Sequence, residues 1–283
     1  MVGLSMPRRE EGQFSSRDNT RLYWQSLLPD GPPQAFVGIV HGFGDHSGRY
    51  RRVMEYLVSQ NIGVLAFDYR GHGKADGRRG YAEQWEEFLN DLEVFWARLR
   101  GMNAGLPTFI LAHSHGALMA CHWALRKPEG LKGLILTSPY LQLALDPPAL
   151  KVLAGKLVGM VIPWLKVPTG ITFAQLSTDE AWQRETAEDT LYGRTTTPRW
   201  FNTSSAAQTQ LAGRGREIVA PILMLTAGAD TIASTPAAKA FFETLGSNDK
   251  QYKEYPGMMH EILCEKDKEA VWKDITSWIS AHR

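Results

Sequence analysis

The sequence predicts an α/β protein in which helices cover both faces of a mostly parallel central sheet. Two observations support this prediction: short apolar runs alternate along the chain with longer amphipathic runs, and the amphipathic runs repeat with helical spacing. Strands that alternate with helices form parallel sheets, because each crossover helix returns the chain to the end of the sheet at which the next strand begins. A length of 283 residues is ordinary for one such domain, so we expect one large core with an insertion.

Six runs are predicted to be buried strands, and the opening segment is predicted to be an edge hairpin. The hairpin covers residues 13–27 and turns at Asp18-Asn19, because both residue types accept the backbone geometry of a tight turn. The six strands are residues 35–40, 62–67, 108–112, 132–137, 221–227 and 251–255.

The clearest helix is predicted at residues 81–100. Its apolar side chains recur at intervals of three and four, which places them on one face that can pack on the sheet. They are Trp85, Phe88, Leu89, Leu92, Trp96 and Leu99. Near the C-terminus the same spacing predicts a second amphipathic helix, and it relates Val271, Ile275, Trp278 and Ile279.

Residues 141–212 lack strong strand signals and are predicted to be a helical cap inserted between two parts of the core, 1–140 and 213–283. Asp146 is suited to cap a helix that Pro147 and Pro148 open. Few residues of this helix are polar, so the insertion either packs closely on the core or leaves an apolar surface for a lipid-like ligand. A lid over a lipid site must do both. One face of the helix carries Leu150, Leu153, Leu157, Val158 and Val161.

The composition limits the classes of function that the chain can have. Hydrophobic residues make up 43% of the chain and the net charge is +1, which gives no reason to expect nucleic acid as a partner. Cys121 and Cys264 lack metal-ligand spacing and fit buried thiols in a reducing compartment, so no metal site is expected. No cofactor is expected either. No secretory signal opens the sequence, so we expect a cytoplasmic protein. Residues 149–162 are too few to span a membrane but suit contact with a membrane surface. The oligomeric state is left open.

The stretch FILAHSHGAL, residues 109–118, predicts a nucleophilic serine. Ser114 lies between an apolar strand and a helix, which is the context that the nucleophile elbow of serine hydrolases requires. The sharp turn exposes the hydroxyl, and the first turn of the helix points unpaired amides at a developing oxyanion. Small residues are needed at positions 112 and 116, where the strand and helix backbones pass closely, and Ala112 adds one methyl group to the usual glycine.

Asp230 and His260 complete a predicted catalytic triad. A serine hydroxyl needs a base, and the base needs an orienting carboxylate. In α/β-hydrolases the three follow in the order Ser, Asp, His, and Asp230 and His260 each follow a late strand in that order.

A glycine-rich loop earlier in the chain is expected to supply the second N–H donor of the oxyanion hole. In VGIVHGFGDHSGRY, residues 37–50, His41-Gly42 turns tightly after a strand, so that the N–H of Phe43 can lie beside that of His115. His41 is interpreted as a brace of this loop. Asp68 and His72, in the glycine-rich turn FDYRGHGKADGRRG, are expected to hold loops beneath the site.

These motifs resemble the monoacylglycerol lipase and lysophospholipase group of α/β-hydrolases, which is also described as serine aminopeptidase S33-like. HGFGDHSGRY resembles the group's HG-x-G-E-H-S-G-R-Y run, FDYRGHGKADG resembles D-x-R-G-H-G-x-S-x-G with Ala75 in place of serine, and AHSHGA resembles G-H-S-M-G-G with Ala112, His115 and Ala117 as departures. The resemblance implies the α/β-hydrolase fold and Ser114, Asp230 and His260 as the triad. It also implies the amides of Phe43 and His115 as the oxyanion hole, and a mobile cap that admits lipid-like acyl chains.

The leading hypothesis is therefore a serine-dependent hydrolase of carboxylic esters that acts on monoacylglycerols, lysophospholipids or small acyl esters through an acyl-enzyme. Phe43, Leu150, Leu153 and Leu157 are the expected substrate-binding residues. Acyl transfer and amide or peptide hydrolysis on the same triad are the alternatives, and a hydrolase-like binding protein without activity is a third. The ring of His115 could make the mouth of the site more polar or compete for the proton of Ser114.

Overall fold

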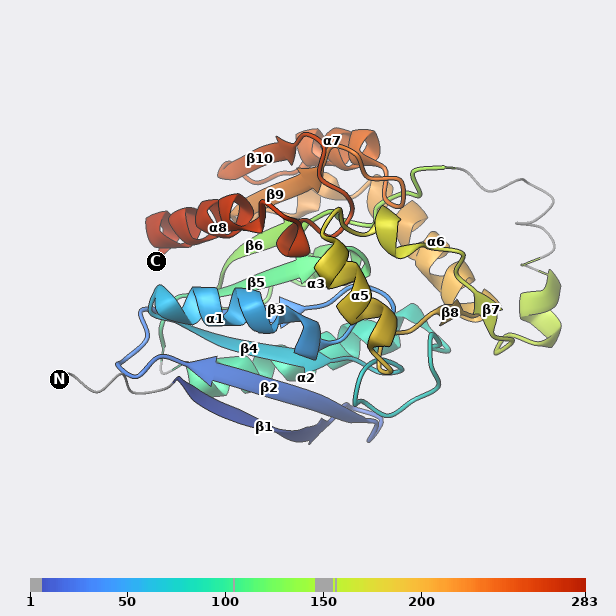
Figure 1. Ribbon diagram of the computed structural model, residues 1–283, viewed down its shortest axis with the longest axis horizontal. Helices are drawn as coiled ribbons and strands as arrows, with labels where there is room; N and C mark the ends of the chain where they lie inside the picture. Colours follow the sequence, from blue (N-terminus) through green and yellow to red (C-terminus); the bar gives the residue numbers. More distant parts are fainter. Residues whose placement is uncertain (1–6, 104, 146–154, 156) are drawn as a thin grey trace.

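An eight-stranded sheet forms the centre of the protein (Figure 1). The computed structural model describes residues 7–103, 105–145, 155 and 157–283. In space the strands follow the order β1-β2-β4-β3-β5-β6-β9-β10. They are β1 (Arg8–Ser15), β2 (Arg21–Leu28), β3 (Ala35–Val40), β4 (Ile62–Asp68), β5 (Thr108–His113), β6 (Leu131–Thr137), β9 (Ile222–Ala227) and β10 (Lys250–Tyr255).

The sheet is parallel from β4 to β10, as the alternation of strands and helices predicts. In this sheet only β2 runs opposite to the other strands, because it pairs antiparallel with both β1 and β4. The strands β1 and β2 form the predicted edge hairpin, in which Asn19 turns the chain with a φ of 66°, but the hairpin begins at Arg8, five residues before the predicted start. The prediction that all six later strands are buried is wrong for β10. This strand lies at the other edge of the sheet, so it pairs on one side only, and Tyr255 is its one buried residue.

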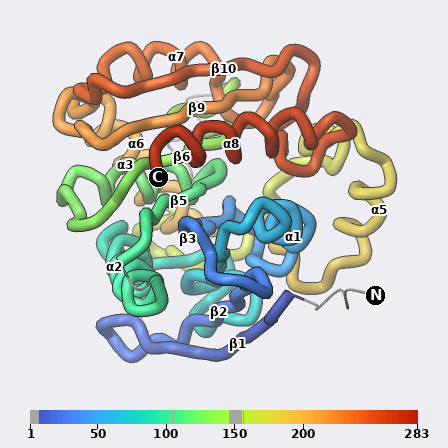
Figure 2. Tube along the Cα trace, turned by 90° about the vertical axis from the view of Figure 1, so that its left-hand side faces the viewer, coloured from blue at the N-terminus to red at the C-terminus, as the bar shows by residue number. Residues whose placement is uncertain are grey.

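Helices cover both faces of the sheet, and each face carries its own apolar core. The helices α1 and α8 pack on one face and α2, α3 and α7 on the other. Figure 2 shows α1 and α2 on opposite sides of β3. The helices are α1 (Arg51–Ser59), α2 (Trp85–Met102), α3 (His115–Ala124), α7 (Thr235–Thr244) and α8 (Lys268–His282). The helix predicted from residue 81 begins four residues later, because Gln84 is still extended, with a φ of −136°.

Between β6 and β9 the described residues leave the sheet, and α5 (Glu180–Glu188) and α6 (Pro198–Ala212) lie near the ends at which the parallel strands finish (Figure 1). In this segment residues 157–161 are also helical. Two strands of two residues each, β7 (Val167–Pro168) and β8 (Thr195–Thr196), pair within it. The predicted helix start at Asp146, Pro147 and Pro148 lies outside the described residues.

Two further features of the fold are the state of the cysteines and the character of the helices. Cys121 is buried, as expected, whereas Cys264 is partly exposed, and both are free thiols. Among the described helices, none has the length and the apolar character that a membrane span requires.

Candidate active site

Ser114 occupies a strained turn between β5 and α3. Its φ of 53° and ψ of −117° lie outside the conformations that a serine ordinarily adopts, and surrounding bonds hold it there. Its N–H donates to the carbonyl of Thr137 at 3.0 Å, and its own carbonyl accepts the N–H of Tyr140 at 3.1 Å. The turn places the hydroxyl at the carboxyl end of β5, as the elbow motif predicts.

The close approach of α3 to β3 explains why small residues are needed here. A Cβ atom added to Gly116 would lie 2.5 Å from the carbonyl oxygen of Val40. No side chain fits at that distance, so only glycine allows α3 to start where it does. Ala112 is fully buried in β5, where its methyl group is accommodated in the apolar core.

His260 links Ser114 to Asp230 through one continuous set of hydrogen bonds. Its Nε2 lies 2.8 Å from the Ser114 Oγ and its Nδ1 lies 2.6 Å from the Asp230 Oδ2. The other carboxylate oxygen of Asp230 accepts the N–H groups of Ile232 at 2.8 Å and Ala233 at 2.9 Å. Asp230 follows β9 and His260 follows β10, so three strand ends bring the three side chains together.

Burial and nearby charges shift the pKa values of Asp230 and His260. Burial acts to raise the pKa of Asp230, but the His260 imidazole and the backbone donors outweigh it and leave the pKa lowered. Burial acts to lower the pKa of His260, yet the Asp230 carboxylate outweighs it and the pKa is raised. A neutral His260 must carry its proton on Nδ1 to donate to Asp230, which leaves Nε2 free to accept a proton from Ser114.

Glu261 is a further buried carboxyl group beside the triad. Burial and the nearby Asp45 charge raise the pKa of Glu261 to about 7, and its negative charge in turn helps to raise the pKa of His260. Asp45 is paired with Arg49, whose Nε lies 2.7 Å from the Asp45 Oδ1. Two carboxyl groups, Asp230 and Glu261, thus act to raise the pKa of His260.

The two predicted oxyanion segments lie beside Ser114. His115 is the first residue of α3, so its N–H belongs to the first turn, whose amides have no acceptor within the helix. Gly42, which precedes Phe43, is close enough to the elbow that an added Cβ atom would lie 3.3 Å from the Ser114 Cβ.

The ring of His115 points away from Ser114 into a buried aromatic cluster. Its Nδ1 lies 3.3 Å from the Tyr69 hydroxyl and its Nε2 lies 3.2 Å from the Ser204 Oγ. Burial lowers the pKa of His115 to about 3, so the imidazole is neutral. Both ring nitrogens are thus engaged by other groups, and the suggested competition for the Ser114 proton has no geometric basis.

The predicted loop braces hold the floor of the site. His41 stacks on Tyr69 with the ring centroids 4.2 Å apart, and its Nδ1 lies 2.7 Å from the carbonyl of Gly42. The Asp68 carboxylate accepts the N–H of Ser47 at 2.7 Å and that of Lys74 at 2.8 Å, so it ties the two glycine-rich loops together. The His72 ring lies against the rings of His41 and Phe43, with centroids 5.4 Å from each, and its Nδ1 lies 3.0 Å from the carbonyl of Arg70.

A mainly apolar cavity of about 380 Å³ opens over the triad. Its walls come from the core and from the segment between β6 and β9. Ser114, His260 and Phe43 lie in its lining, together with Tyr140, Tyr192, Trp200, Phe201 and Ile232. In the described ranges, no three His, Cys, Asp or Glu side chains converge as metal ligands would.

The sequence did not identify most of these wall residues. Trp200 follows Pro198 in α6 and packs against Phe43 at a tilt, with ring centroids 3.8 Å apart, a contact between segments far apart in sequence. Leu157, an expected substrate-binding residue, is half-exposed and is absent from the part of the cavity wall that the structure describes, so its role stays a prediction. Leu150 and Leu153 lie outside the described residues.

Comparisons with known proteins agree on the family. A model of the family described as serine aminopeptidase, S33, matches residues 31–267. An uncharacterized abhydrolase domain-containing protein of Dictyostelium discoideum is 31% identical over 93% of this chain, which corresponds to 28% of that protein's own length.

Two other relatives match along nearly their whole length. Phospholipase YtpA of Bacillus subtilis is 29% identical over 85% of this chain and 93% of its own. The crystal structure of Paleococcus ferrophilus monoacylglycerol lipase superposes with a TM-score of 0.81, at 27% identity, over 98% of this chain and 100% of that one. These likenesses confirm the predicted α/β fold.

Proposed function

The chain belongs to the serine aminopeptidase S33 family of α/β-hydrolases, and we propose that it hydrolyses carboxylic esters through Ser114, His260 and Asp230. The observation that carries the proposal is the unbroken hydrogen-bonded row from the Ser114 Oγ through His260 to Asp230, which opens into an apolar cavity. No other group in the described lining combines a nucleophile with an oriented base.

The proposed reaction has two halves. The Ser114 oxygen attacks the ester carbonyl carbon while its proton passes to the His260 Nε2, and the carbonyl oxygen becomes an oxyanion beside the N–H groups of Phe43 and His115. The intermediate collapses when the leaving alcohol takes the proton from His260, and Ser114 is left acylated. Water then attacks the acyl-enzyme by the same route, returns a proton through His260 and releases the carboxylic acid. These steps need no cofactor.

The proposed substrates are monoacylglycerols, lysophospholipids or small acyl esters. The aromatic and aliphatic cavity walls support an acyl chain there, because burial of each methylene group contributes about 0.8 kcal/mol. A monoacylglycerol lipase and a phospholipase among the similar proteins support a lipid ester with either head group.

We propose that residues 141–212 act as a cap between the core parts 1–140 and 213–283. The contribution of Tyr192, Trp200 and Phe201 to the cavity wall supports this, since it makes the segment part of the substrate site. The expected contact with a membrane surface stays a prediction, which the exposed side chains of Met160, Val161 and Trp164 support.

The Ser114→Ala variant tests the assignment. On an aryl ester we expect kcat to fall at least about 10³-fold, because the remaining site binds the substrate but has no nucleophile. Ser280→Ala, at an exposed position of α8, is the matched control and should match the parent. Turnover by Ser114→Ala close to that of the parent would refute the proposal.

A substrate series resolves the alternatives on the same triad. Esters of increasing acyl length with glycerol, lysophospholipid and aryl leaving groups rank the head groups. An aminoacyl anilide tests amide hydrolysis, and added alcohol as a competing acceptor tests acyl transfer. A binding protein without activity predicts no turnover of any member of the series.

A further inference from the structure

Tyr69 lies directly between the two segments that we assign to the oxyanion hole. It follows β4 and is fully buried. Its hydroxyl donates to the Gly42 carbonyl at 2.9 Å and lies 3.3 Å from the His115 Nδ1. The hydroxyl therefore touches the peptide unit that precedes Phe43 and the side chain of His115 at the same time.

The hydrogen bonds around Tyr69 have only one consistent direction. A carbonyl oxygen can only accept, so the single proton of the Tyr69 hydroxyl is committed to Gly42. The His115 Nδ1 must then donate to the Tyr69 oxygen, which leaves Nε2 of the neutral ring as an acceptor for the Ser204 hydroxyl at 3.2 Å. A directed row thus runs from Ser204 through His115 and Tyr69 to the Gly42 carbonyl.

This row ends on the peptide unit that carries one proposed oxyanion donor. The Gly42 carbonyl and the Phe43 N–H belong to one planar peptide group and point in opposite directions. The Tyr69 hydroxyl and the His41 Nδ1, at 2.9 Å and 2.7 Å, together hold the Gly42 carbonyl on one side and therefore the N–H on the opposite side. When that N–H donates to an oxyanion, the peptide group is polarised and the bond to Tyr69 is strengthened.

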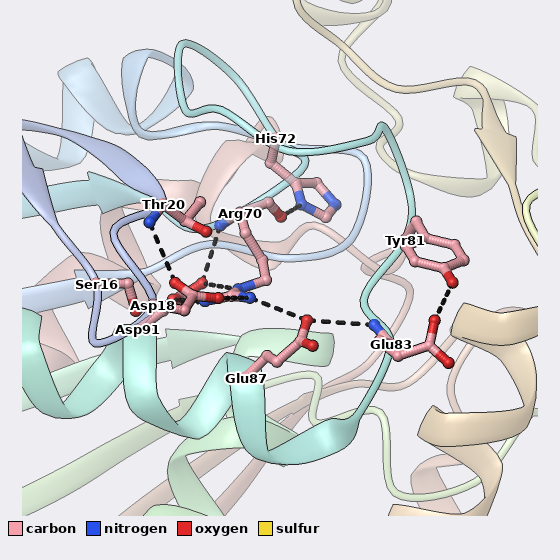
Figure 3. Close-up of polar contacts among 9 residues, drawn as sticks. All are labelled: Ser16, Asp18, Thr20, Arg70, His72, Tyr81, Glu83, Glu87 and Asp91. Atoms are coloured by element: carbon pink, nitrogen blue, oxygen red, sulfur yellow. Dashed lines mark hydrogen bonds and ion pairs between the residues drawn. The ribbon is translucent and has the colours of Figure 1, made fainter.

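Neighbouring residues hold Tyr69 in position. Its ring stacks on His41 and meets the Phe88 ring edge to face, with the centroids 5.6 Å apart. The next residue, Arg70, makes a two-pronged ion pair with the fully buried Asp91, at 2.8 Å and 2.7 Å. Figure 3 shows the Arg70 guanidinium among the carboxylates of Asp18, Glu87 and Asp91. The loop that carries the hydroxyl is therefore anchored at its backbone and at its ring.

We propose that Tyr69 is a positioning residue of the oxyanion hole, which holds the Gly42–Phe43 peptide in its donating orientation, and that Ser204 of α6 secures the far end of the same row. The inference rests on the proposed function, since it assumes that the Phe43 and His115 amides bind the oxyanion. Tyr69 itself does not line the cavity over Ser114.

The Tyr69→Phe variant removes the hydroxyl and keeps the stacked ring. Loss of a whole oxyanion donor costs about 10²–10³-fold in kcat, and a donor that is present but less well held should cost less, about 10-fold to 100-fold. KM should stay within about 2-fold of the parent, because the Gly42–Phe43 peptide is needed for the oxyanion and not for the ground state. Ser204→Ala should lower kcat in the same direction by a smaller factor.

Two inhibitors with the same acyl chain provide a readout that a merely structural role would not move. A trifluoromethyl ketone, which forms a tetrahedral oxyanion on Ser114, should bind Tyr69→Phe more weakly by the same factor as the loss in kcat. The corresponding non-hydrolysable ether, which forms no oxyanion, should bind both proteins equally. Tyr23→Phe is the control, because Tyr23 is also buried and its hydroxyl donates to Glu11 at 2.5 Å, away from the site.

The outcomes separate this inference from the proposed function. An active parent whose Tyr69→Phe variant keeps kcat within about 2-fold would overturn the positioning role and leave the proposed function intact. A variant that loses affinity for the ether as much as for the ketone would also overturn it, since the hydroxyl would then serve the general packing of the site. An inactive parent would overturn both.

Discussion

Replacement of Asp230 by asparagine should reverse the tautomer of the base. The Asp230 Oδ1 accepts two backbone N–H groups, from Ile232 and Ala233, while Oδ2 accepts from His260 at 2.6 Å. Asparagine has one oxygen, and the two backbone donors will hold it at the Oδ1 position. Its NH2 group then faces the His260 Nδ1, which must become an acceptor. The imidazole proton moves to Nε2, where it donates to Ser114 and cannot take the serine proton.

The size of the effect follows from this reversal. The same substitution in a serine protease triad costs about 10⁴-fold in kcat, or about 5 kcal/mol of transition-state stabilisation. KM should change less than about 3-fold, because the carboxylate is 2% exposed and does not line the cavity. Steady-state turnover of an aryl ester measures both constants, at a pH above the acid limb of the kcat/KM profile so that the parent His260 is neutral.

The chain offers a matched control. Asp249 also faces a histidine, with its Oδ2 2.9 Å from the His282 Nε2, but this pair lies at the exposed end of α8. Asp249→Asn should therefore leave kcat unchanged. The reasoning would be refuted if Asp230→Asn kept kcat within about 10-fold of the parent.

Two further predictions concern charge near the site. In Glu261→Gln the acid limb of the kcat/KM profile should move to lower pH, because the Glu261 charge helps to raise the pKa of His260 and His260 must be neutral to act. An acid limb that does not move, or that moves to higher pH, would contradict this prediction. In Asp91→Ala the buried Arg70 loses its two-pronged partner but keeps others, so unfolding in urea should show a loss of about 3 kcal/mol, against less than about 0.5 kcal/mol for the exposed control Glu55→Ala. A loss below about 1 kcal/mol in Asp91→Ala would contradict it.

The strands and the placement of the triad residues were predictable because they depend on local patterns. Apolar runs with β-branched residues define strands at any position, and functional groups at the carboxyl ends of parallel strands must meet at one edge of the sheet. The order of Ser114, Asp230 and His260 at three such strand ends therefore indicated a catalytic site, which none of the three residues indicated alone. The exception was β10, whose low burial follows from its place at the sheet edge, and strand order is not visible in a local pattern.

The row from Ser204 to Gly42 was not predictable, because it joins segments whose relative position only the folded chain defines. His115 was the residue whose ring could not be placed from sequence, and its partners Tyr69 and Ser204 are 46 and 89 residues away. The same holds for Trp200 on Phe43. Contacts between the core and the segment after β6 depend on tertiary packing, which overrides local preference and has no periodic signature.

Covalent labelling with a fluorophosphonate tests the central claim most directly. The reagent phosphonylates only a serine that an adjacent base has activated, so peptide mass spectrometry of the labelled protein identifies the nucleophile by position. The account predicts one adduct on Ser114 in the folded parent and none in Ser114→Ala. A folded parent without an adduct, or with the adduct on another residue, would contradict it.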